Sequence, residues 1–146
     1  MKTPKNAVLA LLAALAIELP ALAAAGPLRK DHPLIGTWQI TLPDGSCHEE
    51  YRFRPDGTTM VTSAQEVAES AFDIADQPDK LGFYKQVDTV VKDNGKQDCS
   101  GEVTEVGHVV TSYLLFHPSG DMFLMCFERD TKTCIGPFVR IKGNAI

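Results

Sequence analysis

The chain lacks the features that most readily identify an activity. Acidic residues outnumber basic ones, 19 to 14, which gives a formal net charge of −5 and argues against a nucleic-acid partner, because such a partner needs a basic face. The four cysteines include no Cys-x-x-Cys pair of the kind used by zinc sites and catalytic thiols, and the sequence contains no Gly-x-Ser-x-Gly motif. We therefore expect no enzymatic activity, no bound metal and no cofactor.

The N-terminal segment, residues 1–25, has the layout of a secretory signal peptide. Lys2 and Lys5 form a short positive region, residues 7–17 form an apolar run, and three alanines precede Gly26. The apolar run is too short to cross a bilayer about 30 Å thick as a helix, which disfavours the alternative of a retained anchor. We expect cleavage after residue 25, or else after residue 23, and export to a periplasm or out of the cell. Residues 26–146 then form one domain without a further membrane-length run.

Export determines how the cysteines are interpreted. Cys47, Cys99, Cys126 and Cys134 form an even set, and an even set in an oxidising compartment predicts two disulfides. Disulfides would stabilise a domain of this size by restricting its unfolded chain. Spacing alone leaves all three pairings open.

Closely spaced turn residues separate runs that alternate between apolar and polar side chains. Trp38 and Ile40 share one side of the first run, and Tyr51 and Phe53 share one side of the second, as expected for antiparallel strands with one buried face. Closure into an up-and-down barrel would remove the exposed edges, whereas a two-sheet sandwich is the alternative. We predict an all-β, eight-stranded antiparallel barrel with strands at 35–42, 47–54, 58–62, 70–75, 83–92, 106–116, 121–128 and 135–142.

Two further expectations follow from this order of strands. Ser63 and Glu66 have the spacing of a capping box, so residues 63–70 are either one or two helical turns or an irregular connection. An up-and-down path that starts with Trp38 at the bottom brings all four cysteines to the top. The pairs Cys47–Cys99 and Cys126–Cys134 are then our preferred disulfides, the second joining adjacent strands, and the other pairings stay open.

The segment Gly36-Thr37-Trp38 resembles the G-x-W motif that opens lipocalin-type barrels of the calycin group. The resemblance implies that Trp38 packs near the closed end of the barrel, under an arginine of the last strand, and Arg140 stands in the matching place. It also implies that the top is a ligand entrance. The chain departs from that family in its short length, in the absence of a second motif and in having no room for a C-terminal helix after residue 141. The resemblance therefore implies a fold but not a ligand.

The interior of the barrel is the first candidate for a function. An eight-stranded barrel is either filled by side chains or just wide enough for one small ligand, and we expect an apolar or amphipathic molecule. Glu49 shares a face with Tyr51 and Phe53. Lys85 shares one with Phe83, which we also expect to point inward. The two charges therefore mark either a polar spot in the cavity or solvated rims. His48 and His108 lie near the top, where we expect solvated side chains rather than metal ligands. The candidate cavity residues are Glu49, Tyr51, Phe53, Phe72, Lys85, Tyr113, Phe123 and Met125.

Two strands carry a different signal. The runs 106–116 and 121–128 are apolar on both faces, so one face would remain as an exposed apolar patch, which usually marks an interface. The patch predicts a homodimer or a partner protein in the cell envelope. The alternative function is therefore a protein-interaction module or an inhibitor of lysozyme-type hydrolases, since an acidic protein complements a basic enzyme.

Overall fold

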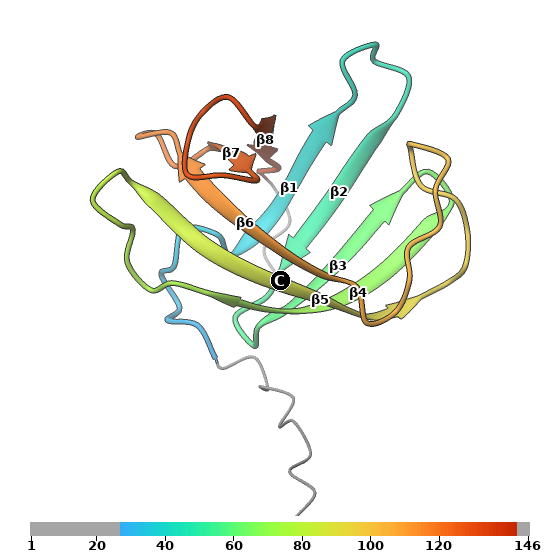
Figure 1. Ribbon diagram of the computed structural model, residues 1–146, viewed down its shortest axis with the longest axis horizontal. Coiled ribbons are helices and arrows are strands. Elements are labelled where there is room, and N and C mark those ends of the chain that lie inside the picture. Colours follow the sequence, from blue (N-terminus) through green and yellow to red (C-terminus); the bar gives the residue numbers. More distant parts are fainter. Residues whose placement is uncertain (1–26, 143–146) are drawn as a thin grey trace, which may run out of the picture.

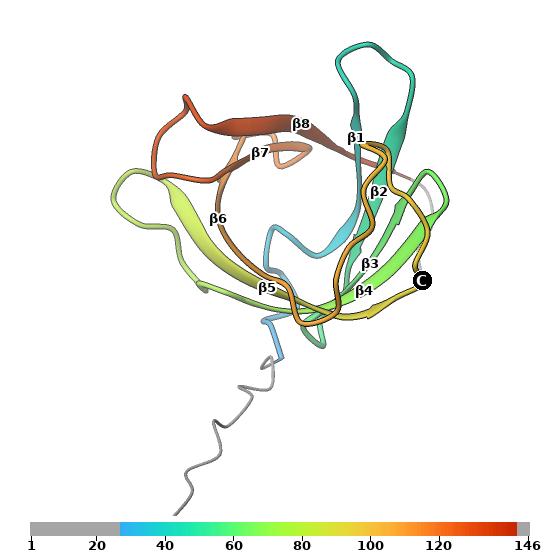
Figure 2. The ribbon, with the colours of Figure 1, turned by 45° about the vertical axis from the view of Figure 1, so that its right-hand side comes forward.

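The structure is a computed structural model that describes residues 27–142, in which eight antiparallel strands form a closed barrel (Figures 1 and 2). Each strand pairs with its neighbours in sequence, and the last returns to the first, so the predicted barrel is confirmed and the sandwich alternative is wrong. The expected signal peptide lies outside the described residues. No helix between residues 27 and 142 has the length and apolar character to span a membrane. The strands are β1 (Gly36–Thr41), β2 (His48–Phe53), β3 (Thr58–Ser63), β4 (Glu66–Ile74), β5 (Phe83–Asp93), β6 (Val109–Phe116), β7 (Met122–Cys126) and β8 (Cys134–Arg140).

The lower half of the barrel is filled by aromatic side chains. Phe123 stacks on Phe138 with ring centroids 4.6 Å apart and meets Trp38 edge to face at 4.7 Å, while Phe53 meets Phe72 edge to face at 5.4 Å. All five side chains are buried. Burial of rings of this size supplies a large part of the hydrophobic stabilisation, so the lower half is core rather than pocket.

The floor of the barrel is built around Trp38 and Arg140. The Arg140 guanidinium carbon lies 4.1 Å from the centroid of the Trp38 ring, which is the stacking that the sequence predicts. Its nitrogens donate hydrogen bonds to the backbone carbonyls of Pro33 (2.7 Å), Ile35 (2.8 Å) and Gly120 (3.1 Å). One side chain therefore ties the last strand, the entry to the first strand and the turn between β6 and β7.

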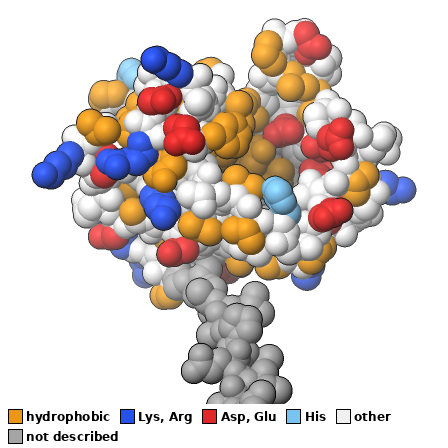
Figure 3. All heavy atoms as spheres, viewed as in Figure 1, with side chains coloured by type: hydrophobic (Ala, Val, Ile, Leu, Met, Phe, Trp, Pro, Cys, Tyr) orange, Lys and Arg blue, Asp and Glu red, His pale blue; other side chains and the backbone are white. Residues whose placement is uncertain are grey.

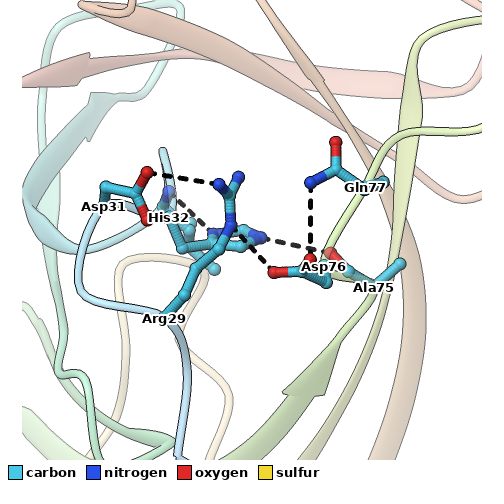
Figure 4. Close-up of polar contacts among 7 residues, drawn as sticks. Arg29, Asp31, His32, Ala75, Asp76 and Gln77 are labelled. Carbon is cyan, nitrogen blue, oxygen red and sulfur yellow. Dashed lines mark hydrogen bonds and ion pairs between the residues drawn. The ribbon is translucent and has the colours of Figure 1, made fainter.

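The segment before β1 crosses beneath this floor and is attached to the end of β4 (Figure 4). The buried His32 ring lies with Nε2 3.1 Å from the carbonyl of Ala75, and its Nδ1 accepts a hydrogen bond from the backbone N–H of Leu34. Arg29 adds an ion pair to Asp76 at 2.8 Å. These contacts hold the bottom of the barrel shut.

The opposite end carries both disulfides. Cys47 is bonded to Cys99 and Cys126 to Cys134, which confirms the preferred pairing. The first bridge ties the loop after β5 to the start of β2, and the second joins β7 to β8 across a short loop. The long loop 94–108 is thus fixed against the top of the barrel.

The expected helical turns at 63–70 are wrong. β3 ends at Ser63, two residues turn the chain, and β4 starts at Glu66, so the segment is a tight hairpin. Ala64 adopts a positive φ of 51°. Two-residue hairpin turns require a positive φ, although here the position is not occupied by the usual glycine or asparagine. Ser63 does not cap a helix, because its hydroxyl donates to Glu49 of the neighbouring strand instead.

Candidate functional site

A cavity of about 150 Å³ lies inside the barrel above the aromatic core. The strand registers pair Phe53 with Thr59 and Gln86 with Ser112, so these side chains share the inward face. About half of the lining residues are apolar, and the others carry hydroxyl, amide or carboxylate groups. The lining residues are Tyr51, Phe53, Thr59, Val61, Gln86, Asp88, Val110, Ser112 and Met125.

A series of hydrogen bonds connects the cavity to the Cys47–Cys99 disulfide. The Tyr51 hydroxyl donates to Glu49 Oε2 at 2.7 Å, and the Ser63 hydroxyl donates to Glu49 Oε1 at 2.6 Å. Ser63 Oγ accepts in turn from the backbone N–H of Cys99 at 2.9 Å. Burial, and then the negative charge of Glu49, hold the pKa of Tyr51 well above its usual value, so the phenol stays neutral.

A second carboxylate faces the cavity from β5. Burial raises the pKa of Asp88, and a hydrogen bond from Ser70 opposes that rise only in part. The nearby Thr59 side chain is 1% exposed, and its hydroxyl has no hydrogen-bond partner among the described residues. An unpartnered buried hydroxyl beside an empty space is available to a bound molecule.

Two more acidic side chains lie above the cavity near the top of β4 and β5. Burial raises the pKa of Glu66, and the neighbouring charges of Asp93 and Asp98 add to the rise, while Thr104 opposes it. Glu66 Oε1 and Asp93 Oδ2 are both buried and without hydrogen-bond partners in the described part of the chain. The upper interior therefore carries several acidic side chains.

The wall of the barrel is incomplete beside Glu49. β1 pairs with β8 only at Trp38–Arg140 and Gln39–Val139, so the two strands separate above those pairs. A groove of about 340 Å³ lies in the gap between β1 and β8. It is lined by Ile40 and Leu42 on one side and by Ile135 on the other, and Glu49 lies at its inner end. Figure 3 shows hydrophobic side chains in the hollow beside the protruding β1–β2 hairpin, with acidic side chains next to them. Glu49 thus stands where the groove meets the Tyr51 end of the cavity.

The structure gathers four of the eight predicted cavity residues at this site. Tyr51, Phe53 and Met125 line the cavity, and Glu49 lies at its edge. Phe72 and Phe123 point inward but belong to the packed core below it.

The remaining two predictions are wrong. Lys85 pairs with Tyr113 on the face of the sheet opposite to Gln86 and Ser112, so both side chains point outward. They lie under the loop between β4 and β5 in an outer depression shared with Arg129. The error for Lys85 comes from Phe83, because the two residues share one face of β5 and an apolar residue is expected to point inward. Phe83 is instead buried on the outer face, beneath the loop between β4 and β5.

Sequence reasoning missed the polar half of the lining. Thr59, Gln86, Asp88 and Ser112 were not singled out, because polar side chains on strands ordinarily face water. Val61 and Val110 were missed too. The hydrogen-bonding registers are the signal that identifies them.

The expected apolar patch is present on the outer face of the barrel. Leu115 pairs with Leu124 there, and these side chains, together with Met122 and Pro137, line a groove of about 370 Å³. Leu114, by contrast, is fully buried and points inward. The apolar character of β6 on both faces thus divides between core and surface.

The two histidines near the top of the barrel do not line the cavity. His48 and His108 are both exposed. Across residues 27–142 there is no group of three or more His, Cys, Asp or Glu side chains suited to hold a metal ion.

Comparison of the chain with protein-family models, with curated proteins and with solved structures finds no match. The geometry of the barrel is therefore the basis for assigning a function.

Proposed function

We propose that this chain is an exported, lipocalin-like barrel that binds a small amphipathic molecule in its interior. The observation that carries the proposal is the cavity of about 150 Å³, closed below by the aromatic core and lined by both apolar and polar side chains. Binding sites for small molecules combine apolar walls with a few placed polar groups. A space of this volume accommodates a molecule the size of benzene.

The G-x-W segment and its arginine support the comparison with lipocalins. Arg140 stacks on Trp38 at the closed end, and the longest loop, 94–108, lies at the other end, where that family admits its ligands. The two disulfides are consistent with an oxidising compartment and so with export. The proposed role is binding rather than catalysis.

Occupation of the cavity can be tested with 2-phenylethanol, a neutral amphipathic probe whose ring is the size of benzene. We expect titration of the disulfide-bonded protein to shift amide signals of β2, β3, β5 and β6 in NMR spectra. Val61→Trp fills the cavity and should weaken the probe at least about tenfold. Thr62→Trp is the matched control, because Thr62 is the exposed neighbour on the same strand. Unshifted amide signals in the parent protein at millimolar probe would contradict the proposal.

A second candidate function rests on the outer groove between β6, β7 and β8. Its lining is almost entirely apolar, and patches of this kind commonly mark an interface. We propose a homodimer through this face, with an envelope protein such as a hydrolase as the other class of partner. Leu124→Lys should convert a dimer to a monomer in sedimentation velocity, while Thr111→Lys, on the exposed outer face of β6, should not. A parent protein that sediments as a monomer would remove the homodimer.

A further inference from the structure

Building on the proposed interior site, we propose that its ligand is a small organic amine. The ammonium group would lie between Glu49 and Asp88, and the apolar part would lie against Phe53, Val61 and Met125. This assignment names the charge and the chemical class of the ligand. Binding of a neutral amphipathic ligand would agree with the proposed function but not with the inference that the ligand is an amine.

The first argument is the charge inside the barrel. Glu49, Asp88 and Glu66 all lie close enough to Tyr51 for their charges to raise its pKa. None of the ion pairs between residues 27 and 142 involves these carboxylates, and no Lys, Arg or His lines the cavity. A buried charge needs a partner of opposite sign, so the site is short of a cation and would repel an anion.

The second argument is independent of the acidic groups. Thr59 faces the interior and lines the cavity, the residue is 1% exposed, and its buried hydroxyl has no partner within the described structure. The Tyr51 hydroxyl uses its hydrogen on Glu49 but keeps lone pairs free to accept. An ammonium group has three donors and no acceptor, as the Lys side chain does. Two carboxylates and two hydroxyl oxygens supply acceptors for those donors from β2, β3 and β5.

The apolar side chains that lie between these acceptors favour an organic cation over a metal ion. Phe53, Val61, Val110 and Met125 offer no oxygen ligand, whereas a calcium ion takes six to eight. Phe53 and Tyr51 also present aromatic rings, which attract cations. Burial raises the pKa of Asp88, and a cation bound beside it would offset that cost. A compact arylalkylamine combines the required charge with the required apolar volume.

The test compares three probes of nearly the same shape and different charge. Phenethylamine is cationic at neutral pH, 2-phenylethanol is neutral and phenylacetate is anionic. Their affinities are measured by NMR titration of the disulfide-bonded protein. We expect phenethylamine to bind at least about tenfold more tightly than 2-phenylethanol, and phenylacetate not to bind, because hydrogen bonds to charged groups exceed neutral ones by about this factor.

Neutral variants then assign the preference to residues. Glu49→Gln and Asp88→Asn should each weaken phenethylamine about tenfold while leaving 2-phenylethanol within about twofold. Glu50→Gln and Asp73→Asn are the matched controls, because both are exposed neighbours on β2 and β4, and they should change neither probe. The two interior variants test the same preference separately, so a folding defect in one does not remove the test.

The outcomes separate this inference from the proposed function. Equal affinity for phenethylamine and 2-phenylethanol, or an amine preference that survives both interior variants, would overturn the amine assignment and leave the interior binding site intact. Failure of all three probes to perturb the barrel would overturn both. Tighter binding of phenylacetate would contradict the charge argument directly.

Discussion

Replacement of Arg140 by methionine should strongly destabilise the floor of the barrel. Methionine keeps an unbranched apolar stem that can still cover Trp38, so the change removes the charge and the donors with little loss of volume. Three backbone carbonyls, of Pro33, Ile35 and Gly120, lose their partner together. The stacking on the indole ring is lost as well.

The magnitude follows from these contacts. A hydrogen bond to a charged group contributes about 1.5 to 3 kcal/mol when buried, and a desolvated cation–π contact contributes about 2 kcal/mol. Arg140 is only partly buried, so water replaces some of its bonds in the variant and the sum is an upper bound. We expect a loss of about 3 to 5 kcal/mol, a large share of the total stability of an ordinary domain.

Urea unfolding followed by Trp38 fluorescence measures this loss, because Trp38 is the only tryptophan in the chain and lies at the site of the change. Lys142→Met is the control. Lys142 forms one exposed ion pair with Asp121 near the same strand end, and its loss should cost less than about 1 kcal/mol. A cost for Arg140→Met no larger than the control would refute the view that the guanidinium holds the floor together.

The remaining predictions concern pH and the disulfides. Burial holds the pKa of His32 below its usual value of 6.5. Just below pH 6.5, His32 is therefore protonated in the unfolded chain but still neutral in the folded chain. The free energy of unfolding should therefore be fully present above pH 6.5 and should fall as the pH drops, and His32→Gln should flatten this slope in urea titrations between about pH 8 and pH 5. Replacing Cys47 and Cys99 together by serine opens a link between residues 52 positions apart and should cost about 4 kcal/mol. The same change at Cys126 and Cys134, 8 positions apart, should cost about 2.5 kcal/mol, so thermal unfolding should rank the first variant clearly lower.

The lower barrel could be predicted from the sequence because its local pattern and its packing agree. Gly36 has a φ of 132°, and a side-chain carbon there would lie 2.6 Å from a guanidinium nitrogen of Arg140. Glycine is therefore required where the arginine crosses the start of β1, two residues before the indole on which it stacks. The motif and the terminal arginine are two parts of one contact, which explains why they predict the closed end together.

The upper barrel was harder to predict because local signals there compete with tertiary ones. Ser63 and Glu66 have the spacing of a helix cap, yet each faces the interior as part of a strand. Ser63 gains a bond to Glu49 and another from the backbone of Cys99, and neither partner is near in sequence. A turn of Ala64 and Gln65 carries no glycine, asparagine or proline to mark it. The local preference of this segment for a helix cap is therefore outweighed by contacts that form only in the closed barrel.

The error in β5 has the same origin and points to the site. The apolar character of Phe83 predicts that it points inward, whereas Gln86 and Asp88 are the residues of β5 that face the cavity. In an ordinary strand such a polar face would be exposed to water, and the barrel instead encloses it at a cost that raises the pKa of Asp88. Sequences tend to break local rules at functional sites, where a cost in stability is retained for binding. The polar inward face of β5 therefore supports the interior site, since a barrel that served only as a packed scaffold would gain stability by placing Asp88 in solvent.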